Sequence, residues 1–483
     1  MLFSFRKKKD DFSYLPSSDK SLSDLAQDRF DIPSLSHTLS GKLFLREELP
    51  LKSHQLETLQ QEQFIQTIPS ITTNPNHCRR CGNTQTSLFG EIPCARCNST
   101  HIYCRNCIEM GRVLQCEELY YWTGPKPTYS IPNEICAWEG KLTGAQQLAA
   151  DRICQTIDQA KEELLCWAVC GAGKTEMLFP AITKAIIAGK RICLATPRAD
   201  VVRELFPRFQ QAFPHITITA LYGGAEKRDA PSQLTLATTH QLIRFADAFD
   251  VMIIDEIDAF PYHADPLLPY VTKRAATKQA AFIYLTATPR KELKLRSDNG
   301  KLPTVFVPIR YHGQPLPEPQ FIISLNLKNT LENYGLPKTF WNWYHNRTQA
   351  NRQLLIFVPT VDHSNQLSQT LQKQLPGQNI AAVHADDSER EEKIQQFRNK
   401  QLFILFSTTI LERGVTFPSV DVVVLDAGHD VFDQAALVQI AGRAGRSADD
   451  PTGDVIFIHD GKTNAMIDAK RMISQMNQKA RKL

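Results

Sequence analysis

A glycine-rich segment at residues 168–175 constrains the fold of this chain more than any other feature. It reads Ala-Val-Cys-Gly-Ala-Gly-Lys-Thr and lies between an apolar run at 164–168 and an apolar helical pattern that begins at Met177. This order predicts a strand, a tight turn and a helix, whose first backbone N–H groups can hold phosphate. The predicted nucleotide contacts are Gly171, Ala172, Gly173, Lys174 and Thr175. In such a loop Lys174 reaches the β- and γ-phosphates, and the Thr175 hydroxyl holds Mg²⁺.

The composition narrows the class of protein. A length of 483 residues predicts about three domains, and a net charge of +4 indicates a local groove for nucleic acid instead of a polybasic surface. No apolar run approaches the ~18 residues of a membrane helix. The charged segment 1–10 is not followed by the apolar stretch of a signal peptide. We therefore expect a cytoplasmic chain whose 12 cysteines act as thiols and metal ligands.

The N-terminal part divides into an arm and a lead-in. Residues 1 to about 40 are rich in Ser, Asp and Lys, which predicts a mobile arm, and leucines within 41–70 predict a short helical lead-in. The basic run 6–9 could contact phosphate or an anionic surface, although a solvated tail is the simpler interpretation. We expect the first domain boundary near residue 70.

Paired cysteines predict a metal-binding domain at 71–136, linker included. Cys-x-x-Cys occurs at Cys78/Cys81, Cys94/Cys97 and Cys104/Cys107, and Cys116 follows. Each pair offers two corners of a tetrahedron, so two pairs can close a zinc site. The spacing leaves open which pairs combine, and two metals could share the region. The surrounding arginines suit contact with phosphate, and the aromatic, proline-rich stretch 117–136 predicts a linker packed on the next domain, with base stacking as the alternative.

An α/β domain is predicted for residues 137–308. Thr143 is suited to cap a helix in which Gln146 could pair with the edge of adenine. Predicted strands at 191–196, 219–221 and 234–237 each end in small, hydroxyl or basic residues. Because parallel strand ends share one edge of a sheet, these residues could hold a DNA backbone. The candidate DNA contacts are Thr196, Arg198, Gly223, Gly224, Thr239 and His240.

An acidic pair follows the buried strand predicted at 251–254. Asp255 would hold Mg²⁺ through water, whereas Glu256 would orient and deprotonate the attacking water. Another predicted strand, 282–285, ends in Thr-Ala-Thr at 286–288, whose hydroxyls could link the carboxylates to movement.

A second α/β domain is predicted for residues 318–460, after a proline-rich connector at 303–319. Its predicted strands are 354–358, 380–383, 402–406, 422–425 and 454–458. Candidate DNA contacts are Thr408 and Thr409, and Gln439 is a candidate nucleotide contact. Arg443 and Arg446 are predicted to share one helix face and to stabilise the transition state of phosphoryl transfer, a solvated pair being the alternative. The basic segment 461–483 predicts an amphipathic or frayed helix.

The ordered motifs resemble the motor of superfamily 2 helicases. The set comprises residues 146, 168–175, 196–198, 238–241, 255–258, 286–288, 407–416 and 439–446. This resemblance covers about 138–460 and implies two RecA-like parallel-sheet domains that form a helicase core, preceded by a small zinc-binding domain. It also implies ATP and Mg²⁺ as ligands.

A closer resemblance is to the ComFA family of late-competence ATPases. It is carried by Cys-Arg-Arg-Cys at 78–81, Tyr-Cys-Arg-Asn-Cys at 103–107, Asp-Glu-Ile-Asp-Ala-Phe-Pro-Tyr at 255–262 and Thr-Thr-Ile-Leu-Glu-Arg-Gly-Val-Thr-Phe-Pro at 408–418. The resemblance implies Zn²⁺ at Cys78, Cys81, Cys104 and Cys107, with Cys94 and Cys97 as extras. It implies a single-stranded DNA translocase in natural competence, at the cytoplasmic face of the membrane beside other competence proteins; a homo-oligomer stays open.

Three other functions are weighed against this one. Replication-restart helicases also combine this motor with zinc, but their zinc site is inserted late in the motor. The early position of the cysteines here disfavours that function. An RNA helicase does not usually carry zinc before the motor. A non-catalytic zinc-dependent DNA scaffold would not need Lys174, Glu256, Arg443 and Arg446.

Overall fold

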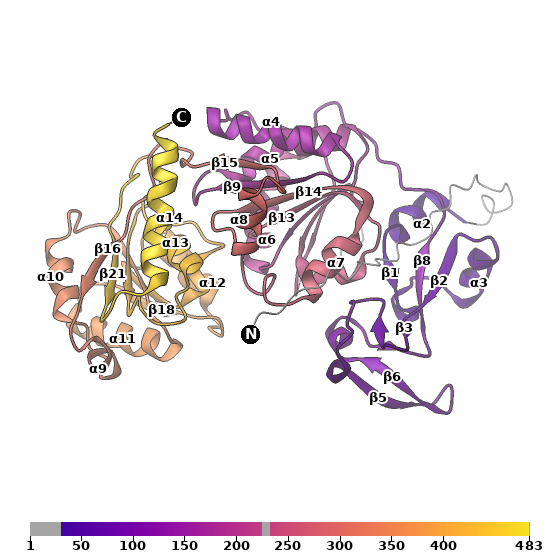
Figure 1. The fold of residues 1–483 in the computed structure, drawn as a ribbon, viewed down its shortest axis with the longest axis horizontal. Coiled ribbons are helices and arrows are strands. Elements are labelled where there is room, and N and C mark those ends of the chain that lie inside the picture. The colour runs from indigo at the N-terminus through magenta and orange to yellow at the C-terminus, as the bar shows by residue number, and fades with distance from the viewer. Residues whose placement is uncertain (1–29, 225–231, 483) are drawn as a thin grey trace. The chain divides into compact units, whose positions relative to one another are not determined.

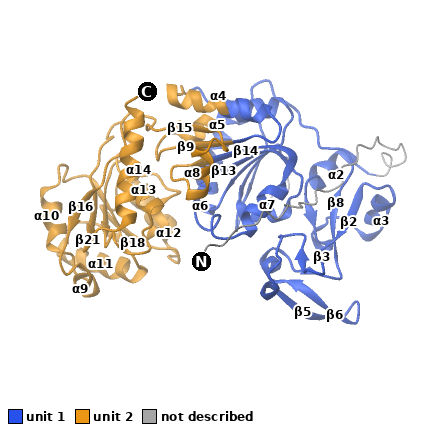
Figure 2. Cartoon of the chain, viewed as in Figure 1, with its two compact units in different colours: residues 1–139, 153–163, 179–284 blue, residues 140–152, 164–178, 285–483 orange. Residues whose placement is uncertain are grey.

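The computed structural model of the protein describes residues 30–224 and 232–482 (Figure 1). The chain divides into two compact units (Figure 2), one of residues 1–139, 153–163 and 179–284 and one of residues 140–152, 164–178 and 285–483. Among the described helices, none has the length and apolar character that a bilayer crossing requires.

The N-terminal region is built on a three-stranded antiparallel sheet of order β1-β8-β2. Its strands are β1 (Leu43–Phe44), β2 (Ile65–Pro69) and β8 (Glu118–Trp122). Two helices, α2 (Ile32–Leu39) and α3 (Ser53–Gln61), pack their apolar side chains into the same small core. Phe64 and Trp122 stack there with ring centroids 5.6 Å apart.

Two expectations for this region are wrong. The predicted arm includes helix α2, which begins where the Asp31 carboxylate accepts a 3.1 Å hydrogen bond from Ser34 N–H. Residues 118–122 of the predicted linker form the central strand, because their alternate side chains face a core supplied by distant segments. Residues 1–29, with the basic run 6–9, lie outside the described residues.

The cysteine-rich segment between β2 and β8 is a ribbon of short antiparallel strands. Strand β3 (Ile71–Thr72) pairs with β4 (His77–Cys78). Strands β5 (Phe89–Cys94), β6 (Ser99–Cys104) and β7 (Val113–Leu114) form a second sheet in that order. A 3₁₀ turn, η3 (Arg105–Met110), follows β6. The ribbon therefore leaves the small N-terminal sheet after β2 and returns to it at β8.

The first large sheet has seven strands in the order β11-β12-β10-β13-β14-β9-β15. Their bounds are β9 Glu163–Ala168, β10 Ile192–Thr196, β11 Ile218–Leu221, β12 Leu234–Thr238, β13 Phe249–Asp255, β14 Ala276–Thr286 and β15 Thr304–Val307. The associated helices are α4 Gly144–Asp158, α5 Lys174–Ile187, α6 Ala199–Ala212, α7 Leu267–Ala275 and α8 Lys291–Asp298. Strand β15 lies within the predicted domain 137–308 and pairs in parallel with β9, so the predicted connector at 303–319 begins too early.

The second large sheet has six strands in the order β16-β21-β20-β17-β19-β18, and every pair is parallel. The bounds are β16 Gln320–Ile323, β17 Gln353–Phe357, β18 Ile380–Val383, β19 Ile404–Ser407, β20 Val420–Leu425 and β21 Val455–His459. Its helices are α9 Leu327–Glu332, α10 Lys338–Asn346, α11 Val361–Gln374, α12 Arg390–Arg398, α13 Gln434–Ala441 and α14 Asn464–Ala480. The five predicted strands are present, whereas edge strand β16 was not predicted.

Together these sheets confirm the predicted α/β class with two parallel-sheet domains. The C-terminal segment is a well-packed amphipathic helix, since α14 buries Met466, Met472, Ile473 and Met476. It therefore belongs to the second domain and does not fray.

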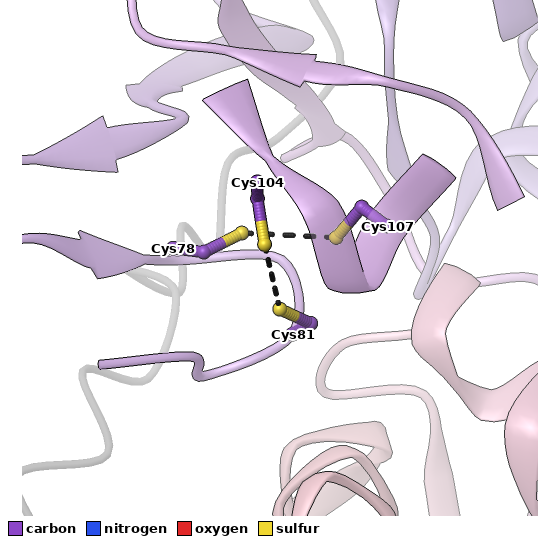
Figure 3. A group of neighbouring side chains, drawn as sticks. All are labelled: Cys78, Cys81, Cys104 and Cys107. Atoms are coloured by element: carbon purple, nitrogen blue, oxygen red, sulfur yellow. Dashed lines mark hydrogen bonds between the residues drawn. The ribbon is translucent and has the colours of Figure 1, made fainter. Parts of the chain in front are cut away.

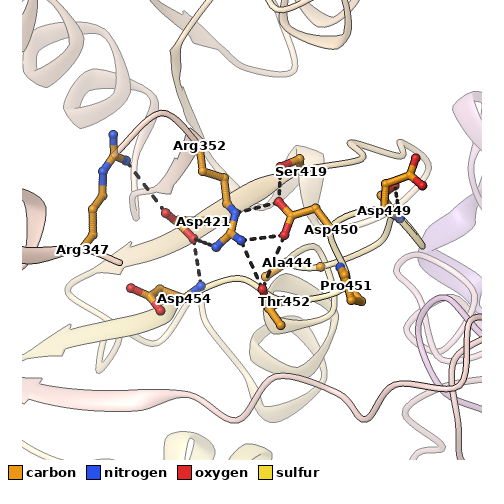
Figure 4. Close-up of polar contacts among 12 residues, drawn as sticks. Arg347, Arg352, Ser419, Asp421, Ala444, Asp449, Asp450, Pro451, Thr452 and Asp454 are labelled. Atoms are coloured by element: carbon orange, nitrogen blue, oxygen red, sulfur yellow. Dashed lines mark hydrogen bonds and ion pairs between the residues drawn. The ribbon is translucent and has the colours of Figure 1, made fainter. Parts of the chain in front are cut away.

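A buried ionic network joins Arg352, just before β17, to Asp421 of β20 and to the segment after α13 (Figure 4). The guanidinium of Arg352 donates to Asp421 at 2.9 Å and, through two nitrogens, to Asp450 at 2.9 and 2.6 Å. Asp421 also accepts a 2.9 Å hydrogen bond from Asp454 N–H. Because Asp421 and Arg352 are both buried, the network replaces the water that these charges would otherwise need.

Candidate nucleotide and zinc sites

The phosphate loop has the predicted backbone. Strand β9 ends at Ala168, Ala172 N–H donates 3.1 Å to Val169 O, and α5 begins at Lys174. Gly171 and Gly173 have φ of +77° and +72°, the left-handed conformation that favours glycine. The turn therefore presents backbone at a helix N-terminus, which is the environment that a phosphate anion requires.

Gln146 lies against this loop. Its side-chain oxygen accepts from Thr143 N–H at 2.8 Å, and its amide nitrogen donates to Ala172 O at 2.8 Å. Thr143 is the predicted cap, with Oγ1 3.4 Å from Gln146 N. A Cβ on Gly173 would lie 2.3 Å from the Gln146 nitrogen, so the loop and this amide fit closely. Gln146 thus holds the loop; its contact with adenine stays a prediction.

The acidic pair occupies the end of β13. Strand β13 ends at Asp255, whose carboxylate accepts a 3.0 Å hydrogen bond from Glu256 N–H. Glu256 has a φ of +55° and is only 9% exposed, so the chain turns sharply and carries its carboxyl group inward. A non-glycine residue whose backbone is held in this rarely adopted conformation is a candidate functional position.

The loop also contacts the predicted Gln439 segment. The Cys170 thiol donates a 3.0 Å hydrogen bond to the Gln439 side-chain oxygen. Gly442 packs on the same cysteine, since a Cβ there would lie 2.4 Å from the Cys170 Cβ. The predicted close approach at Gly442 is therefore present, and its partner is the residue before Gly171.

The two candidate arginines do not share a helix face, so this prediction is wrong. Helix α13 ends at Ala441, and Arg443 and Arg446 lie beyond it. Arg443 is 1% exposed, and its guanidinium donates to the carbonyls of Glu412, at 3.0 Å, and Val415. Arg446 is half-buried and donates 2.9 Å to Gly442 O. Their part in catalysis stays a prediction.

The sequence motifs did not predict the role of Arg310 and Tyr311, which form a connection, here called the strap. The Arg310 guanidinium donates to the carbonyls of Ala444, Pro315 and Pro451 at 2.9, 2.6 and 2.7 Å. Tyr311 N–H donates 2.9 Å to Gly171 O. Burial is the main cause that lowers the pKa of Arg310 to about 10, and repulsion from Arg446 is the second. The strap ties the phosphate loop to the segment after α13; the lone arginine among the connector prolines was its signal in the sequence.

The candidate DNA contacts in the first domain follow neighbouring strand ends. Thr196 of β10 is in register with Thr238 of β12, so Thr196 and the residues after Thr238 lie at one edge of the sheet. Thr196 and Thr239 are buried, whereas His240 is exposed. This structure thus makes His240 directly available to a polymer and shields the two hydroxyl groups.

The other candidate DNA contacts lie in turns and at helix starts. Arg198 precedes α6 and forms a 3.3 Å ion pair with Asp200. Gly223 and Gly224 are exposed after β11, and Thr408 and Thr409 are half-buried where a 3₁₀ turn begins. All of these DNA contacts stay predictions.

Four buried sulfur atoms meet in the ribbon (Figure 3). Cys78 and Cys107 have sulfurs 3.8 Å apart, Cys81 and Cys104 have sulfurs 3.4 Å apart, and all four lie within 4.8 Å of one another. Zinc bound to four thiolates at ~2.3 Å requires sulfur separations of about 3.8 Å. The first and third Cys-x-x-Cys pairs therefore fit the group that the resemblance implies.

The surroundings of these sulfurs support a metal site. Hydrogen bonds from Cys107, Cys78 and Cys81 lower the pKa of Cys104, while hydrogen bonds with Cys104 raise the pKa of Cys81 and of Cys107. The Asn83 amide nitrogen lies 3.8 Å from the Cys104 sulfur. Such contacts orient a ligand and balance its charge.

The arginines near the cysteines include two that are already paired. Arg80 is fully buried and donates to both carboxylate oxygens of Glu48 at 2.7 and 2.8 Å. Arg96 forms an ion pair with Glu117. Arg80 is thus a brace between ribbon and lead-in, and it is unavailable to phosphate.

The ribbon packs on helix α7 of the same unit. Gly82 has a φ of +76°, and a Cβ there would lie 2.6 Å from the Tyr270 ring. The Arg274 guanidinium donates 3.2 Å to Arg79 O and 2.6 Å to Ile243 O. The cysteine site is therefore joined to the first large domain by packing as well as by the chain.

Comparison with protein families gives three matches along the chain. Residues 27–121 match the competence protein ComFA N-terminal domain, residues 139–291 the type III restriction enzyme res subunit, and residues 336–448 the helicase conserved C-terminal domain. Superfamily 2 helicases combine the last two, so these matches agree with the fold and the motif order.

Curated relatives extend over nearly the whole chain. The chain is 44% identical to competence protein ComFA of Bacillus subtilis strain 168 over 451 residues, which cover 93% of this chain and 96% of the relative. It is 37% identical to competence protein ComFA of Streptococcus pneumoniae R6 over 451 residues, covering 91% and 98%. Among solved structures, DEAD-box helicase Mss116 bound to ssRNA and UDP-BeF is similar in fold, with a TM-score of 0.52, 17% identity, and coverage of 65% of this chain and 69% of that one.

Proposed function

The chain belongs to the ComFA family of competence proteins, and from that premise we propose that it is an ATP-driven translocase on single-stranded DNA. Its task would be to draw transforming DNA into the cell during natural competence. The observation that carries the proposal is the contact of the phosphate loop with the 439–446 segment, through Cys170 and Gly442. A motor needs such a contact because a change at the nucleotide must be transmitted to a second element.

The proposed division of labour assigns phosphate to the loop. The first N–H groups of α5 and the Lys174 ammonium hold the β- and γ-phosphates of ATP, and Thr175 and Asp255 hold Mg²⁺. Glu256 orients the attacking water and takes its proton. The Gly173 cradle supports this assignment, since a side chain there would strike Gln146.

The arginines supply charge to the transition state in this proposal. The Arg446 side chain is half-buried, so it can move without disrupting a packed core. Arg443 first has to exchange the Glu412 and Val415 carbonyls for phosphate oxygens. The exchange would couple hydrolysis to the 408–416 segment, where Thr408 and Thr409 are the proposed DNA contacts.

Zinc, partners and location complete the proposal. Zn²⁺ on Cys78, Cys81, Cys104 and Cys107 would fix the ribbon, which packs on α7. By family membership the motor would work at the cytoplasmic face of the membrane with other competence proteins. The five-part division of the chain stays a prediction.

The test is the steady-state ATPase rate of zinc-replete protein at one fixed salt concentration. It is measured without nucleic acid and then with single-stranded DNA, duplex DNA or RNA, since backbone binding depends on salt. Stimulation by single-stranded DNA alone is expected. Stimulation chiefly by RNA would overturn the DNA assignment, and absence of turnover under all four conditions would favour the non-catalytic scaffold.

A further inference from the structure

A second group of cysteines lies outside the tetrad. The sulfurs of Cys94 and Cys97 are 3.8 Å apart, those of Cys116 and Cys94 are also 3.8 Å apart, and all three lie within 4.8 Å of one another. Three thiolates around zinc at ~2.3 Å have this separation of about 3.8 Å. We propose that Cys94, Cys97 and Cys116 bind a second zinc ion.

The backbone supplies this geometry from two separate segments. Cys94 ends β5 and pairs with Ser99 of β6, so Cys97 lies in the turn between the two strands. Cys116 comes from the segment after β7, whose Gln115 N–H donates 2.8 Å to Ile102 O. The three sulfurs therefore converge because the hairpin turn is folded toward the 115–117 segment.

An ion pair joins the same two segments. Arg96, between the first two cysteines, pairs with Glu117, next to the third. The pair places a positive charge beside the cluster and a negative charge beyond it. Three thiolates with Zn²⁺ carry a net charge of −1, so Arg96 would also balance the site.

The second site is distinct from the tetrad because they occupy opposite ends of one hairpin. Cys104 pairs with Phe89 at the base of β5–β6, and Cys94 pairs with Ser99 at its tip. Five residue steps at ~3.4 Å separate these pairs by about 17 Å. One ion cannot span this length, so each end would have its own.

The hairpin needs a brace at its tip. Residues 94–100 are exposed or half-buried, and an isolated two-stranded hairpin is at best marginally stable in water. Zinc bonds from Cys94 and Cys97 to Cys116 would close the tip without a hydrophobic core. The three protein ligands leave the fourth position to water or to an incoming thiol or imidazole, as in sites with an open position.

The test is the zinc content of the full-length, reduced protein by elemental analysis and native mass spectrometry. We expect two ions per chain in the wild type and one ion in both Cys97→Ser and Cys116→Ser. Cys136→Ser is the matched control, because Cys136 is half-buried and lies outside both groups, and it should keep two. One ion in the wild type and in every variant would overturn the proposal.

A second measurement does not depend on the folding of a variant. Since the tetrad is buried and the second site is half-exposed, a chelator should remove one ion from the wild type well before the other. Release of both at one rate would contradict the assignment. A disulfide between Cys94 and Cys97 in the protein as purified without reductant would also contradict the assignment, because these sulfurs would then not be thiolates. It would be seen as a peptide that is lighter by two hydrogen atoms.

Discussion

The Cys170 thiol donates a 3.0 Å hydrogen bond to the side-chain oxygen of Gln439. Cys170 precedes the first glycine of the phosphate loop, and Gln439 lies in the last turn of α13. A displacement of the loop would therefore be transmitted through this hydrogen bond to the segment that carries Arg443 and Arg446. The sequence motifs contain both residues, but they do not predict the hydrogen bond between them.

Substitution of Gly442 tests this link. In Gly442→Ala the new methyl group would lie 2.4 Å from the Cys170 Cβ, so loop and segment must move apart. Overpacking of this kind costs ~1–3 kcal/mol, and we expect the ATPase kcat to fall about tenfold or more. Gly377→Ala is the matched control, since a Cβ there meets nothing within 4 Å. A wild-type kcat in Gly442→Ala would show that the contact has no part in turnover.

The Lys174→Ala variant tests the phosphate loop itself. Loss of the ammonium group removes the contact to the β- and γ-phosphates, so turnover should disappear while DNA binding is largely retained. The ATPase rate and the affinity for a labelled single strand are the two measurements. Lys184→Ala provides the control on the same helix, because Lys184 is exposed and pairs with Asp158. Full ATPase in Lys174→Ala would refute the loop assignment.

The Cys78→Ser variant tests the tetrad. Three thiolates in a buried pocket built for four should hold zinc poorly, so one ion per chain is expected to be lost and DNA binding or folding weakened. Zinc content reports the first effect, and circular dichroism with thermal unfolding reports the second. Cys136→Ser should match the wild type in both. Unchanged zinc in Cys78→Ser would exclude this cysteine as a ligand.

Local motifs made much of the architecture predictable. Residues 168–175 read as strand, turn and helix because glycines and apolar runs act over a few positions, and alternating elements then fix the parallel class. The cysteine tetrad was selected by family resemblance, since spacing alone allowed Cys94 and Cys97 to compete. Their separation from the tetrad depends on the length of the hairpin, which no local pattern reports.

The errors have a common physical origin in long-range contacts. Arg443 and Arg446 were placed on one helix face from their spacing of three residues, yet α13 ends at Ala441 and the Arg443 side chain turns inward to the carbonyls of Glu412 and Val415. Strand β15 was included in the connector because prolines flank it at 303 and 308, whereas pairing with β9 decides its structure. Helix α2 was missed because its core is supplied from residues 49–65 and 122.

The Arg310 guanidinium braces the segment after α13 by donating hydrogen bonds to backbone carbonyl groups. In Arg310→Met the carbonyls of Ala444, Pro315 and Pro451 lose a shared donor in a buried position, which costs ~1–3 kcal/mol for each group left unsatisfied. We expect a lower melting temperature and reduced ATPase. Arg310→Lys should restore little, because one ammonium cannot reproduce the planar fork. Wild-type stability in Arg310→Met would contradict the bracing role.

Substitution of Arg352 tests how much the buried ionic network contributes to stability. Arg352→Met would leave Asp421 buried, with Arg347 4.0 Å away as its remaining cation, and would release Asp450. Breaking a buried pair on one side costs ~3–5 kcal/mol, so the urea midpoint of the second domain should fall clearly. Arg471→Met is the control, because that exposed arginine forms only a surface pair with Asp468 and should change stability little.

A second substitution identifies the cause of this loss. Asp421→Asn in the Arg352→Met background removes the buried carboxylate charge and keeps the oxygen that accepts from Asp454 N–H. If this charge, left with Arg347 alone at 4.0 Å, is responsible, the double variant should be more stable than Arg352→Met alone, as measured by urea unfolding. Equal stability of the two would instead assign the loss to the hydrogen bonds that Arg352 makes with Asp450 and Thr452.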